Sequence, residues 1–127
     1  MAGHLDGATV LVVEDEFLIL LDLEHVLTSA GATITTASSL AEAMAAAGQR
    51  FDVAILDVRL PDGDVYPVAR MLMESDVPIV FHSGHAHNDN IAGDFPSAVA
   101  LEKPAREQVL IAAVEGQIAA ARTGTGR

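Results

Sequence analysis

The stretch FDVAILDVRLPDGD (residues 51–64) contains a run of apolar residues that stops at Asp57. A short apolar run between polar residues predicts a buried strand over residues 52–56. A proline, a glycine and two more aspartates follow, which is typical of a loop. The simplest interpretation of Asp57 is a strand end that turns into a polar loop. The alternative is that the loop presents Asp57 as a nucleophilic carboxylate.

Four other segments have the same character, because they are short, apolar or β-branched, and bounded by turn residues. They are ATVLVV (8–13), ATITTA (32–37), PIVF (78–81) and AVAL (98–101). Three of the five runs are almost continuously apolar, as expected of strands that are covered on both faces. The sequence therefore predicts five strands in a sheet that has helices on both sides.

Helical patterns lie between these strands. Residues 16–30 predict a mostly buried helix, which Gly31 is placed to end. The polar positions of this helix form one stripe, made of Asp22, His25 and Ser29. The segment SLAE (39–42) is a capping-box pattern that begins a second helix, and Gly48 is placed to end that one.

Two further helices are predicted in the second half of the chain. Asp64 is a candidate N-cap for a helix that runs to about Glu74, and Pro67 is tolerated in its first turn. The last helix follows Pro104. Side chains four residues apart give it a core stripe, made of Leu110, Val114 and Ile118. Residues 84–97 predict a loop with at most one short helix.

Strands that alternate with helices predict a parallel α/β sheet whose crossovers are right-handed. The length of 127 residues fits one such domain. We expect the domain to cover residues 8–122, with a disordered or tag-derived segment at 1–7 and a frayed tail at 123–127. Ligands of such sheets collect at the carboxyl ends of the strands. Functional residues should therefore directly follow the strands.

The composition argues against several classes of function. The chain has no cysteine, which excludes disulfides, zinc thiolates and thiol nucleophiles and makes a reducing cytoplasm the default location. Eighteen acidic against seven basic residues give a net charge of −11, which repels nucleic-acid backbones and anionic membranes. Its apolar runs are too short to span a bilayer. We therefore expect neither nucleic acid nor membrane as a partner.

Five polar side chains follow the predicted strands, namely Glu14, Asp15, Asp57, Ser83 and Lys103, the only lysine of the chain. Three carboxylates at one edge of a sheet repel one another and raise one another's pKa unless a cation joins them. Mg²⁺ suits such a pocket, because it takes one or two carboxylates together with water and phosphate oxygens. The set predicts phosphoryl transfer to Asp57, with positive charge from the metal and Lys103 and a hydroxyl donor in Ser83.

The segments VLVVEDE, AILDVRLPDG, IVFHSGH and LEKP resemble, in order and spacing, the signature segments of the receiver domain of two-component response regulators. The resemblance covers nearly the whole chain. It implies a flavodoxin-like (βα)5 fold, a doubly wound five-stranded parallel sheet in the order 2-1-3-4-5. It also implies an aspartyl phosphate that is formed from a phosphohistidine of a sensor histidine kinase or a phosphotransfer protein. Such a domain is not an enzyme beyond its own phosphorylation and dephosphorylation.

The resemblance implies a role for each residue of the set. Asp57 would be the phosphoacceptor and a Mg²⁺ ligand, Asp15 a direct ligand, and Glu14 a ligand through water. The backbone carbonyl of Arg59 would be a further ligand. Ser83 would donate a hydrogen bond to the phosphoryl group.

The resemblance also implies that Lys103 pairs with the phosphoryl group, and that its bond to Pro104 is often cis in this family. Arg59 and His85 lie two positions beyond the phosphoacceptor and the serine. We predict that they tune the lifetime of the aspartyl phosphate by admitting or excluding the hydrolytic water. Gly84 would leave space for the phosphoryl group.

The sequence departs from the family pattern in three places. Most receivers carry Tyr or Phe three residues before the lysine, whereas this chain has Ala100, so the usual aromatic switch is missing. The loop after Asp57 is PDGD rather than a longer Pro-x-Met-Asp-Gly form. VYPVA and VPIVFHSGH resemble a subgroup of stand-alone receivers that work with alphaproteobacterial-type sensor kinases. Because the residues end soon after the last helix, we expect that no output domain is attached. The domain would then act through contact with an unidentified partner protein.

Two other functions stay open. A degenerate receiver that binds a partner without phosphorylation fits the missing aromatic residue but not the complete Asp, Ser and Lys set. A phosphatase of the haloacid dehalogenase type also has a nucleophilic Asp after a strand, but its general acid lies two residues later, where this chain has Arg59. Three histidines suggest a metal site, but without a zinc pattern we interpret them as parts of a solvated loop: His82, His85 and His87.

Overall fold

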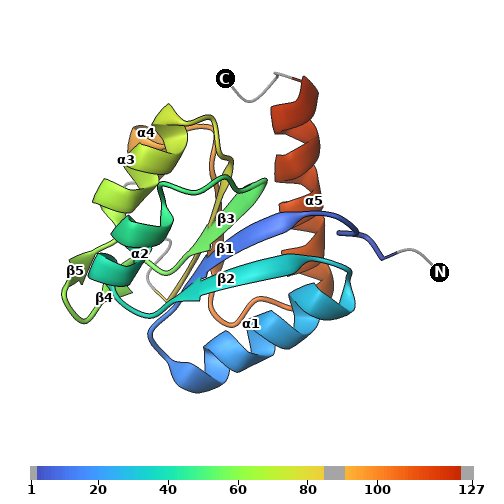
Figure 1. Cartoon of the computed structure of the whole chain (residues 1–127), viewed down its shortest axis with the longest axis horizontal. Coiled ribbons are helices and arrows are strands. Elements are labelled where there is room, and N and C mark those ends of the chain that lie inside the picture. The colour runs from blue at the N-terminus through green and yellow to red at the C-terminus, as the bar shows by residue number, and fades with distance from the viewer. Residues whose placement is uncertain (1–2, 85–90, 124–127) are drawn as a thin grey trace.

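Five strands form one parallel sheet in the computed structural model, which describes residues 3–84 and 91–123 (Figure 1). The strands are β1 (Thr9–Val13), β2 (Thr33–Ala37), β3 (Val53–Leu56), β6 (Ile79–Ser83) and β7 (Val99–Glu102). Their order in the sheet is β2-β1-β3-β6-β7, and every neighbouring pair is parallel. The predicted flavodoxin-like fold and its strand order 2-1-3-4-5 are therefore confirmed.

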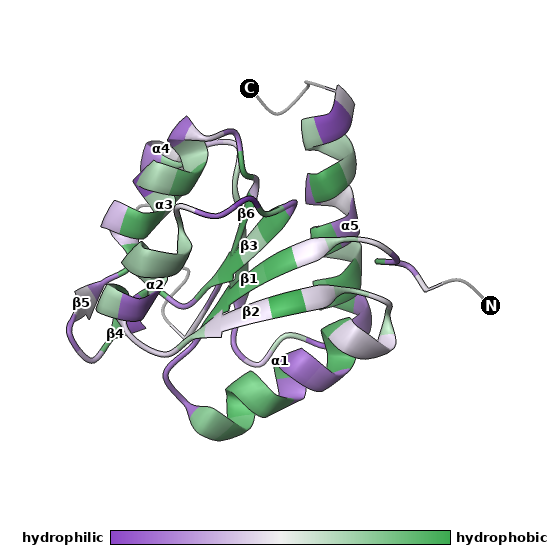
Figure 2. Ribbon diagram, in the orientation of Figure 1, coloured by the Kyte–Doolittle hydropathy of each residue, from purple (hydrophilic) through white to green (hydrophobic). Residues whose placement is uncertain are grey.

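Helices cover both faces of the sheet. On one face lie α1 (Phe17–Ser29) and α5 (Glu107–Thr123), and on the other lie α2 (Leu40–Ala46), α3 (Tyr66–Glu74) and the short α4 (Ile91–Asp94). Each face has its own cluster of buried apolar side chains, and the sheet separates the two clusters. Figure 2 shows the corresponding hydrophobic colour along the central strands.

The apolar run that ends at Asp57 is explained by this arrangement. All four residues of β3 are buried, because Val53 and Ile55 face the cluster under α1 and α5, whereas Ala54 and Leu56 face the other cluster. A strand buried on both faces is expected to be nearly continuously apolar. Asp57 is the first residue past this strand, and its N–H donates to the carbonyl of Val13 at 2.9 Å, so it lies directly at the carboxyl edge.

Two of the predicted helix boundaries are confirmed. Gly31, at the end of α1, has a φ of 102°, a backbone conformation that favours glycine. Ser39 caps α2, because its Oγ accepts a hydrogen bond from the N–H of Glu42 at 3.1 Å. The carboxylate of Glu42 reaches back to the N–H of Ser38 at 2.7 Å, which completes the cap one residue earlier than in the standard capping box.

The predicted cap of α3 is wrong. The N-cap of this helix is Val65, and no side chain caps it. Asp64 instead belongs to β5 (Gly63–Asp64), which pairs with β4 (Arg59–Leu60) in a small antiparallel hairpin. The backbone of Asp64 is paired with Arg59 in this hairpin, and the helix begins only at Tyr66, one residue too late for Asp64 to be its N-cap.

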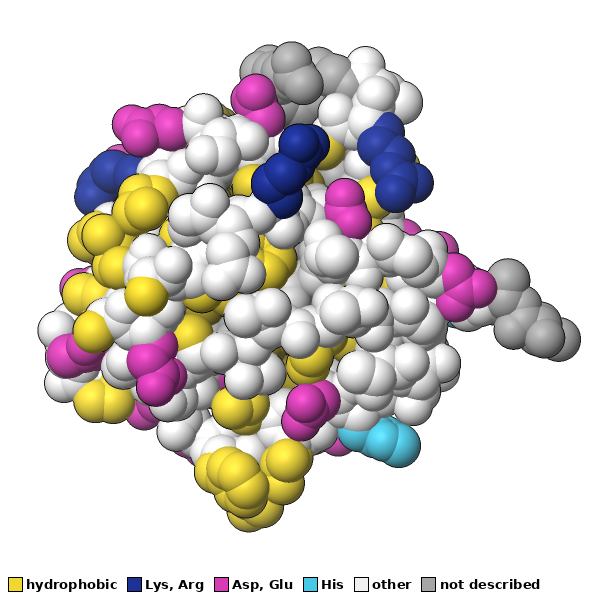
Figure 3. Space-filling model, in the orientation of Figure 1, with side chains coloured by type: hydrophobic (Ala, Val, Ile, Leu, Met, Phe, Trp, Pro, Cys, Tyr) yellow, Lys and Arg dark blue, Asp and Glu magenta, His cyan; other side chains and the backbone are white. Residues whose placement is uncertain are grey.

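The prediction that α1 is mostly buried is also wrong. Only Leu23, Val26 and Leu27 of this helix are buried. Three large apolar side chains at its start are exposed, with exposed fractions of 69% for Phe17, 78% for Leu18 and 44% for Leu21. Figure 3 shows hydrophobic side chains gathered at the lower edge of the molecule, over the start of α1. This end of the helix lies beyond the carboxyl ends of the strands, where the sheet does not cover it.

The packed part of the chain begins before residue 8. Leu5 is 2% exposed, and its N–H donates to the carbonyl of Ala30 at 2.8 Å, which fixes the N-terminal segment against the end of α1. At the other end, α5 continues to Thr123, and the rest of the predicted tail lies outside the described residues. None of the described helices is long and apolar enough to cross a membrane.

Candidate functional site

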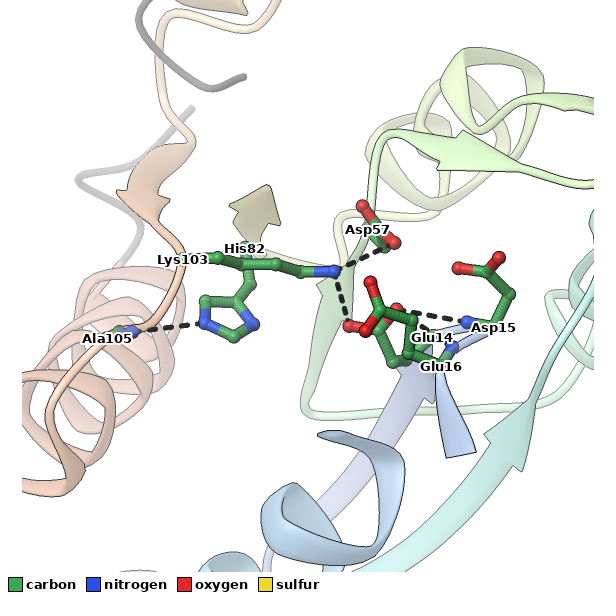
Figure 4. Close-up of polar contacts among 7 residues, drawn as sticks. All are labelled: Glu14, Asp15, Glu16, Asp57, His82, Lys103 and Ala105. Carbon is green, nitrogen blue, oxygen red and sulfur yellow. Dashed lines mark hydrogen bonds and ion pairs between the residues drawn. The ribbon is translucent and has the colours of Figure 1, made fainter. Parts of the chain in front are cut away.

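Three carboxylates and the single lysine meet at the carboxyl edge of the sheet (Figure 4). Glu14 follows β1, Asp57 follows β3 and Lys103 follows β7. One carboxylate oxygen from each of Glu14, Asp15 and Asp57 lies within 4.8 Å of the other two. The Nζ atom of Lys103 lies 3.0 Å from Oδ2 of Asp57 and 2.6 Å from Oε1 of Glu14. Parallel topology thus brings together residues that are far apart in sequence.

Glu14 is the most deeply buried member of this cluster, with 1% of its surface exposed. Its Oε2 accepts hydrogen bonds from the N–H groups of Asp15 at 3.0 Å and Glu16 at 3.3 Å. Its Oε1 is in ion-pair contact with Lys103 but has no well-directed hydrogen bond to any described residue. The side chain therefore holds the turn after β1, and this turn leaves Asp15 exposed at the mouth of the site.

The charges of the cluster are not balanced by the lysine. Burial, together with the neighbouring Asp57, raises the pKa of Glu14 to about 7, although Lys103 acts in the opposite direction. Burial alone would lower the pKa of Lys103, but its contacts with Glu14 and Asp57 outweigh burial and raise that pKa. One ammonium for three carboxylates leaves an excess of negative charge. A cluster of carboxylate oxygens with such an excess fits a hard divalent cation such as Mg²⁺.

Ser83 and Gly84 lie beside this cluster, at the end of β6. Ser83 is 1% exposed, and its carbonyl accepts the N–H of Lys103 at 3.0 Å, which ties the ends of β6 and β7 together. Gly84 is exposed, and a Cβ atom added to it would meet no described atom within 4 Å, so the space around it is open. His85, predicted to modulate the site, lies outside the described residues, as does His87.

The loop after Asp57 is fastened to α2 by a residue that the sequence analysis did not single out. The carboxylate of Asp62 accepts the N–H groups of Leu40 at 2.7 Å and Ala41 at 3.0 Å, and these bonds lower its pKa. An acidic side chain at the first turn of a helix is favourable for this reason. Arg59, the other predicted modulator, is exposed at the start of the same hairpin, opposite Asp64.

Ala100, at the predicted switch position, is exposed on β7 and lies opposite Phe81 of β6. Aromatic side chains gather on the neighbouring elements instead. The ring of Phe81 lies 5.4 Å from that of Phe95 and 6.3 Å from that of Tyr66, and the rings of Tyr66 and Phe95 stack at 5.9 Å. This aromatic cluster joins the start of α3, the strand β6 and the residue that directly follows α4.

The prediction that His82 belongs to a solvated loop is wrong. His82 is 5% exposed within β6, and its Nε2 accepts the N–H of Ala105 at 3.3 Å (Figure 4). Burial, and next the charge of Lys103, lower its pKa. The sequence signal is weak, because a histidine in IVFHSGH can be read as the first residue of the loop or as the end of the strand.

A groove lies next to the site, between α1 and α5. It encloses about 560 Å³ and is lined by Leu18, Leu23 and Leu110, with His82 and Ala105 among the residues near the site. The exposed apolar side chains at the start of α1 adjoin the groove, because Leu18 belongs to both.

The chain matches the model of a known family. The family model described as the response regulator receiver domain matches residues 10–115. Among curated proteins, the chain is 36% identical over 95 residues to the transcriptional regulatory protein TcrA of Mycobacterium tuberculosis. This match covers 72% of the present chain and 38% of TcrA, so the chain spans less than half the length of that relative.

Solved structures of similar proteins have the same fold. A response regulator receiver protein from Sinorhizobium medicae is 36% identical, with a TM-score of 0.83 over 90% of this chain and 96% of that one. The receiver domain of the sensor histidine kinase PA1611 from Pseudomonas aeruginosa is 25% identical, with a TM-score of 0.74 over 89% and 98% of the two chains. The structure of that domain has a magnesium ion coordinated in its active site cleft.

Proposed function

The chain belongs to the response regulator receiver domain family, and on this premise we propose that it accepts a phosphoryl group on Asp57 from a phosphohistidine of a partner protein. The observation that carries the proposal is the contact of Lys103 with Asp57 at 3.0 Å inside a cluster of three carboxylates. Receiver domains are signalling modules, and we expect no catalysis beyond self-phosphorylation and dephosphorylation. The proposed output is a protein contact that depends on phosphorylation.

The proposed transfer is a displacement at phosphorus. A carboxylate oxygen of Asp57 forms a bond to phosphorus while the bond from phosphorus to the donor imidazole nitrogen breaks, and that nitrogen keeps the electron pair. Lys103 already contacts Asp57, so its ammonium is placed to stabilise the negative oxygens of the transferred group. Ser83, at the end of β6, would donate a hydrogen bond to one of these oxygens.

The same residues would hold Mg²⁺. Asp15 and Asp57 would provide carboxylate oxygens, Glu14 would contact the ion through water, and the backbone carbonyl of Arg59 would be a further ligand. Bound Mg²⁺ would supply positive charge to the phosphoryl oxygens. The excess of carboxylates over ammonium groups, with the raised pKa of Glu14, supports this assignment.

The exposed start of α1 supports a protein as the phosphoryl donor. Phe17 and Leu18 are the most exposed large apolar side chains described, and they follow the metal-site residue Asp15 by two and three positions. Apolar side chains exposed beside a reactive site mark a docking surface. We propose that a sensor histidine kinase or phosphotransfer protein binds here. The net charge of −11 argues against direct contact of this domain with nucleic acid.

Incubation with acetyl phosphate and Mg²⁺, followed by intact mass spectrometry, tests the phosphoacceptor. The wild-type protein should gain the mass of one phosphoryl group, and Asp57→Asn should gain none. Asp64→Asn is the matched control, because Asp64 is an exposed aspartate in the same loop that lies outside the carboxylate cluster. Equal labelling of wild type and Asp57→Asn would refute the assignment, and an unlabelled wild type would favour a degenerate receiver.

Replacement of Leu18 by serine tests the docking surface. The variant should accept a phosphoryl group from acetyl phosphate at the wild-type rate, because Leu18 is outside the carboxylate cluster. Transfer from a phosphorylated sensor kinase or phosphotransfer protein should become slower. Val109→Ser is the control, because Val109 is an exposed large apolar residue on another helix, α5. If Leu18→Ser is phosphorylated normally by both kinds of donor, the start of α1 is not the docking surface.

A further inference from the structure

His82 combines two features that the proposed reaction does not explain. It is buried at the end of the strand that carries Ser83, and its side chain lies on the other side of the sheet from that of Phe81, under α1 and α5. One ring nitrogen accepts a backbone hydrogen bond from Ala105. The other, Nδ1, is buried and has no hydrogen-bond partner among the described residues.

The segment that carries Lys103 is held to β6 at two points. The N–H of Lys103 donates to the carbonyl of Ser83 at 3.0 Å, and the N–H of Ala105 donates to Nε2 of His82 at 3.3 Å. His82 and Ser83, which are adjacent in β6, thus hold both ends of the segment 103–105. The ammonium of Lys103 extends from this segment to Asp57 (Figure 4).

The contact with Ala105 sets the tautomer of the ring. Because Nε2 accepts a hydrogen bond, it cannot carry a proton, so the neutral imidazole has its proton on Nδ1. A buried N–H without a partner is unfavourable, and an apolar side chain would fill the same space without that cost. The histidine is therefore not explained by packing alone, whereas the acceptor that it offers to Ala105 is a specific contact.

We propose that His82 is a positioning residue for phosphoryl transfer, because it accepts the N–H of Ala105 and so holds the Lys103 segment in the place from which the ammonium reaches Asp57. This inference rests on the proposed phosphorylation of Asp57. It predicts that an acceptor atom at the position of Nε2, rather than the imidazole as such, is what the site needs.

Two substitutions separate the acceptor from the bulk of the side chain. His82→Leu fills much of the same volume but has no acceptor, whereas His82→Gln can present its amide oxygen near the position of Nε2. Phosphorylation by acetyl phosphate with Mg²⁺ should be slower in His82→Leu by roughly two- to tenfold, as expected for the loss of one hydrogen bond. His82→Gln should recover most of the wild-type rate. His25→Leu, at an exposed histidine of α1, is the matched control and should not change the rate.

A second readout reports on the contact itself and does not depend on the reaction. The amide proton of Ala105, followed by NMR, should shift and exchange faster with solvent in His82→Leu, and His82→Gln should largely restore its protection. Rates are compared at a temperature at which circular dichroism shows every variant to be folded, so that a loss of folding is not read as a loss of positioning.

The possible results separate this inference from the proposed function. If the wild-type protein is phosphorylated on Asp57 and His82→Leu reacts equally fast, the positioning role is overturned and the proposed function stands. The positioning role is also overturned if His82→Gln is phosphorylated slowly although its Ala105 amide stays protected from exchange. In that case the hydrogen bond to Ala105 would be present but would not restore the rate. If the wild-type protein takes up no phosphoryl group, both ideas fail together.

Discussion

Lys103 Nζ lies 3.0 Å from Asp57 Oδ2, although the two residues are 46 positions apart in the sequence. The ammonium also contacts Glu14, so one cation is shared between two buried carboxylates. Their proximity is a consequence of parallel topology, because Asp57 and Lys103 each follow the carboxyl end of a strand.

Replacement of Lys103 by methionine should destabilise the metal-free protein. The variant keeps an apolar stem of similar length but leaves Glu14 and Asp57 together without a cation. Removal of one partner of a buried ion pair is strongly unfavourable. We expect a loss of about 2 kcal/mol in the free energy of unfolding, because Glu14 can take up a proton and so reduce its repulsion with Asp57. Urea unfolding in EDTA measures this change. Arg106→Met, at an exposed basic residue, should have the wild-type stability, and an unchanged Lys103→Met would show that the contact does not stabilise the fold.

The stability of the metal-free protein should decrease as the pH rises from 5 to 8. Glu14 has a pKa of about 7 in the folded protein, against 4.5 for an ordinary glutamate, so between these values the folded state binds a proton that the unfolded chain does not. The stabilisation from this proton is complete below pH 4.5 and is lost as the pH rises through 7. Each pKa unit corresponds to about 1.4 kcal/mol, which gives a total on the order of 2 kcal/mol for a partly solvated group.

Urea unfolding at pH 5 and pH 8 in EDTA tests this pH dependence, with Glu14→Gln as the control that should remove most of it. Mg²⁺ should act in the opposite direction, because its ligands must be deprotonated, so its affinity should increase over the same pH range. Equal pH dependence in the wild type and in Glu14→Gln would mean that another group is responsible.

The fold and the core of the site could be predicted from the sequence for a common physical reason. A strand buried on both faces is nearly continuously apolar, so β3, most of β1 and the first three residues of β6 are visible as apolar runs. Because the carboxyl ends of parallel strands share one edge, the residue that follows each run is placed near the others. This local rule locates Glu14 and Asp57 without knowledge of any distant contact.

Features that depend on what covers a residue could not be predicted in this way. The apolar pattern of α1 indicates a wide apolar face, but it does not tell how much of that face the sheet reaches, and Leu18 is in fact exposed. His82 is buried because β6 continues to Ser83 in register with β7, where His82 lies opposite Leu101. Asp62 caps a helix that begins 22 positions earlier in the chain. Each of these outcomes depends on tertiary contacts rather than on a local pattern.

Replacement of Asp62 by alanine should lower the thermal midpoint of unfolding by a few degrees. Its carboxylate satisfies two N–H groups at the start of α2, which would otherwise rely on water. The lowered pKa of Asp62 means that this stabilisation is present above the ordinary aspartate pKa of 3.8 and is lost as the pH falls through the lower folded value. Asp64→Ala, in the same hairpin, is the control for a change of charge. Equal midpoints for the two variants would show that the cap has no specific effect.

Phe95 should contribute more to stability than its place directly after the four-residue helix α4 suggests. Its ring is 2% exposed, stacks on Tyr66 at 5.9 Å and meets Phe81 at 5.4 Å, so it holds α4 against β6 and α3. Phe95→Ala removes both the buried area and the ring contacts and should cost about 3–5 kcal/mol, whereas Phe95→Leu keeps most of the volume and should cost about 1 kcal/mol. Met73→Ala, at a half-exposed apolar residue of α3, should cost much less. Chemical unfolding of the three variants measures these differences. A cost for Phe95→Ala as small as that for Met73→Ala would show that α4 does not depend on the aromatic cluster for its place on the sheet.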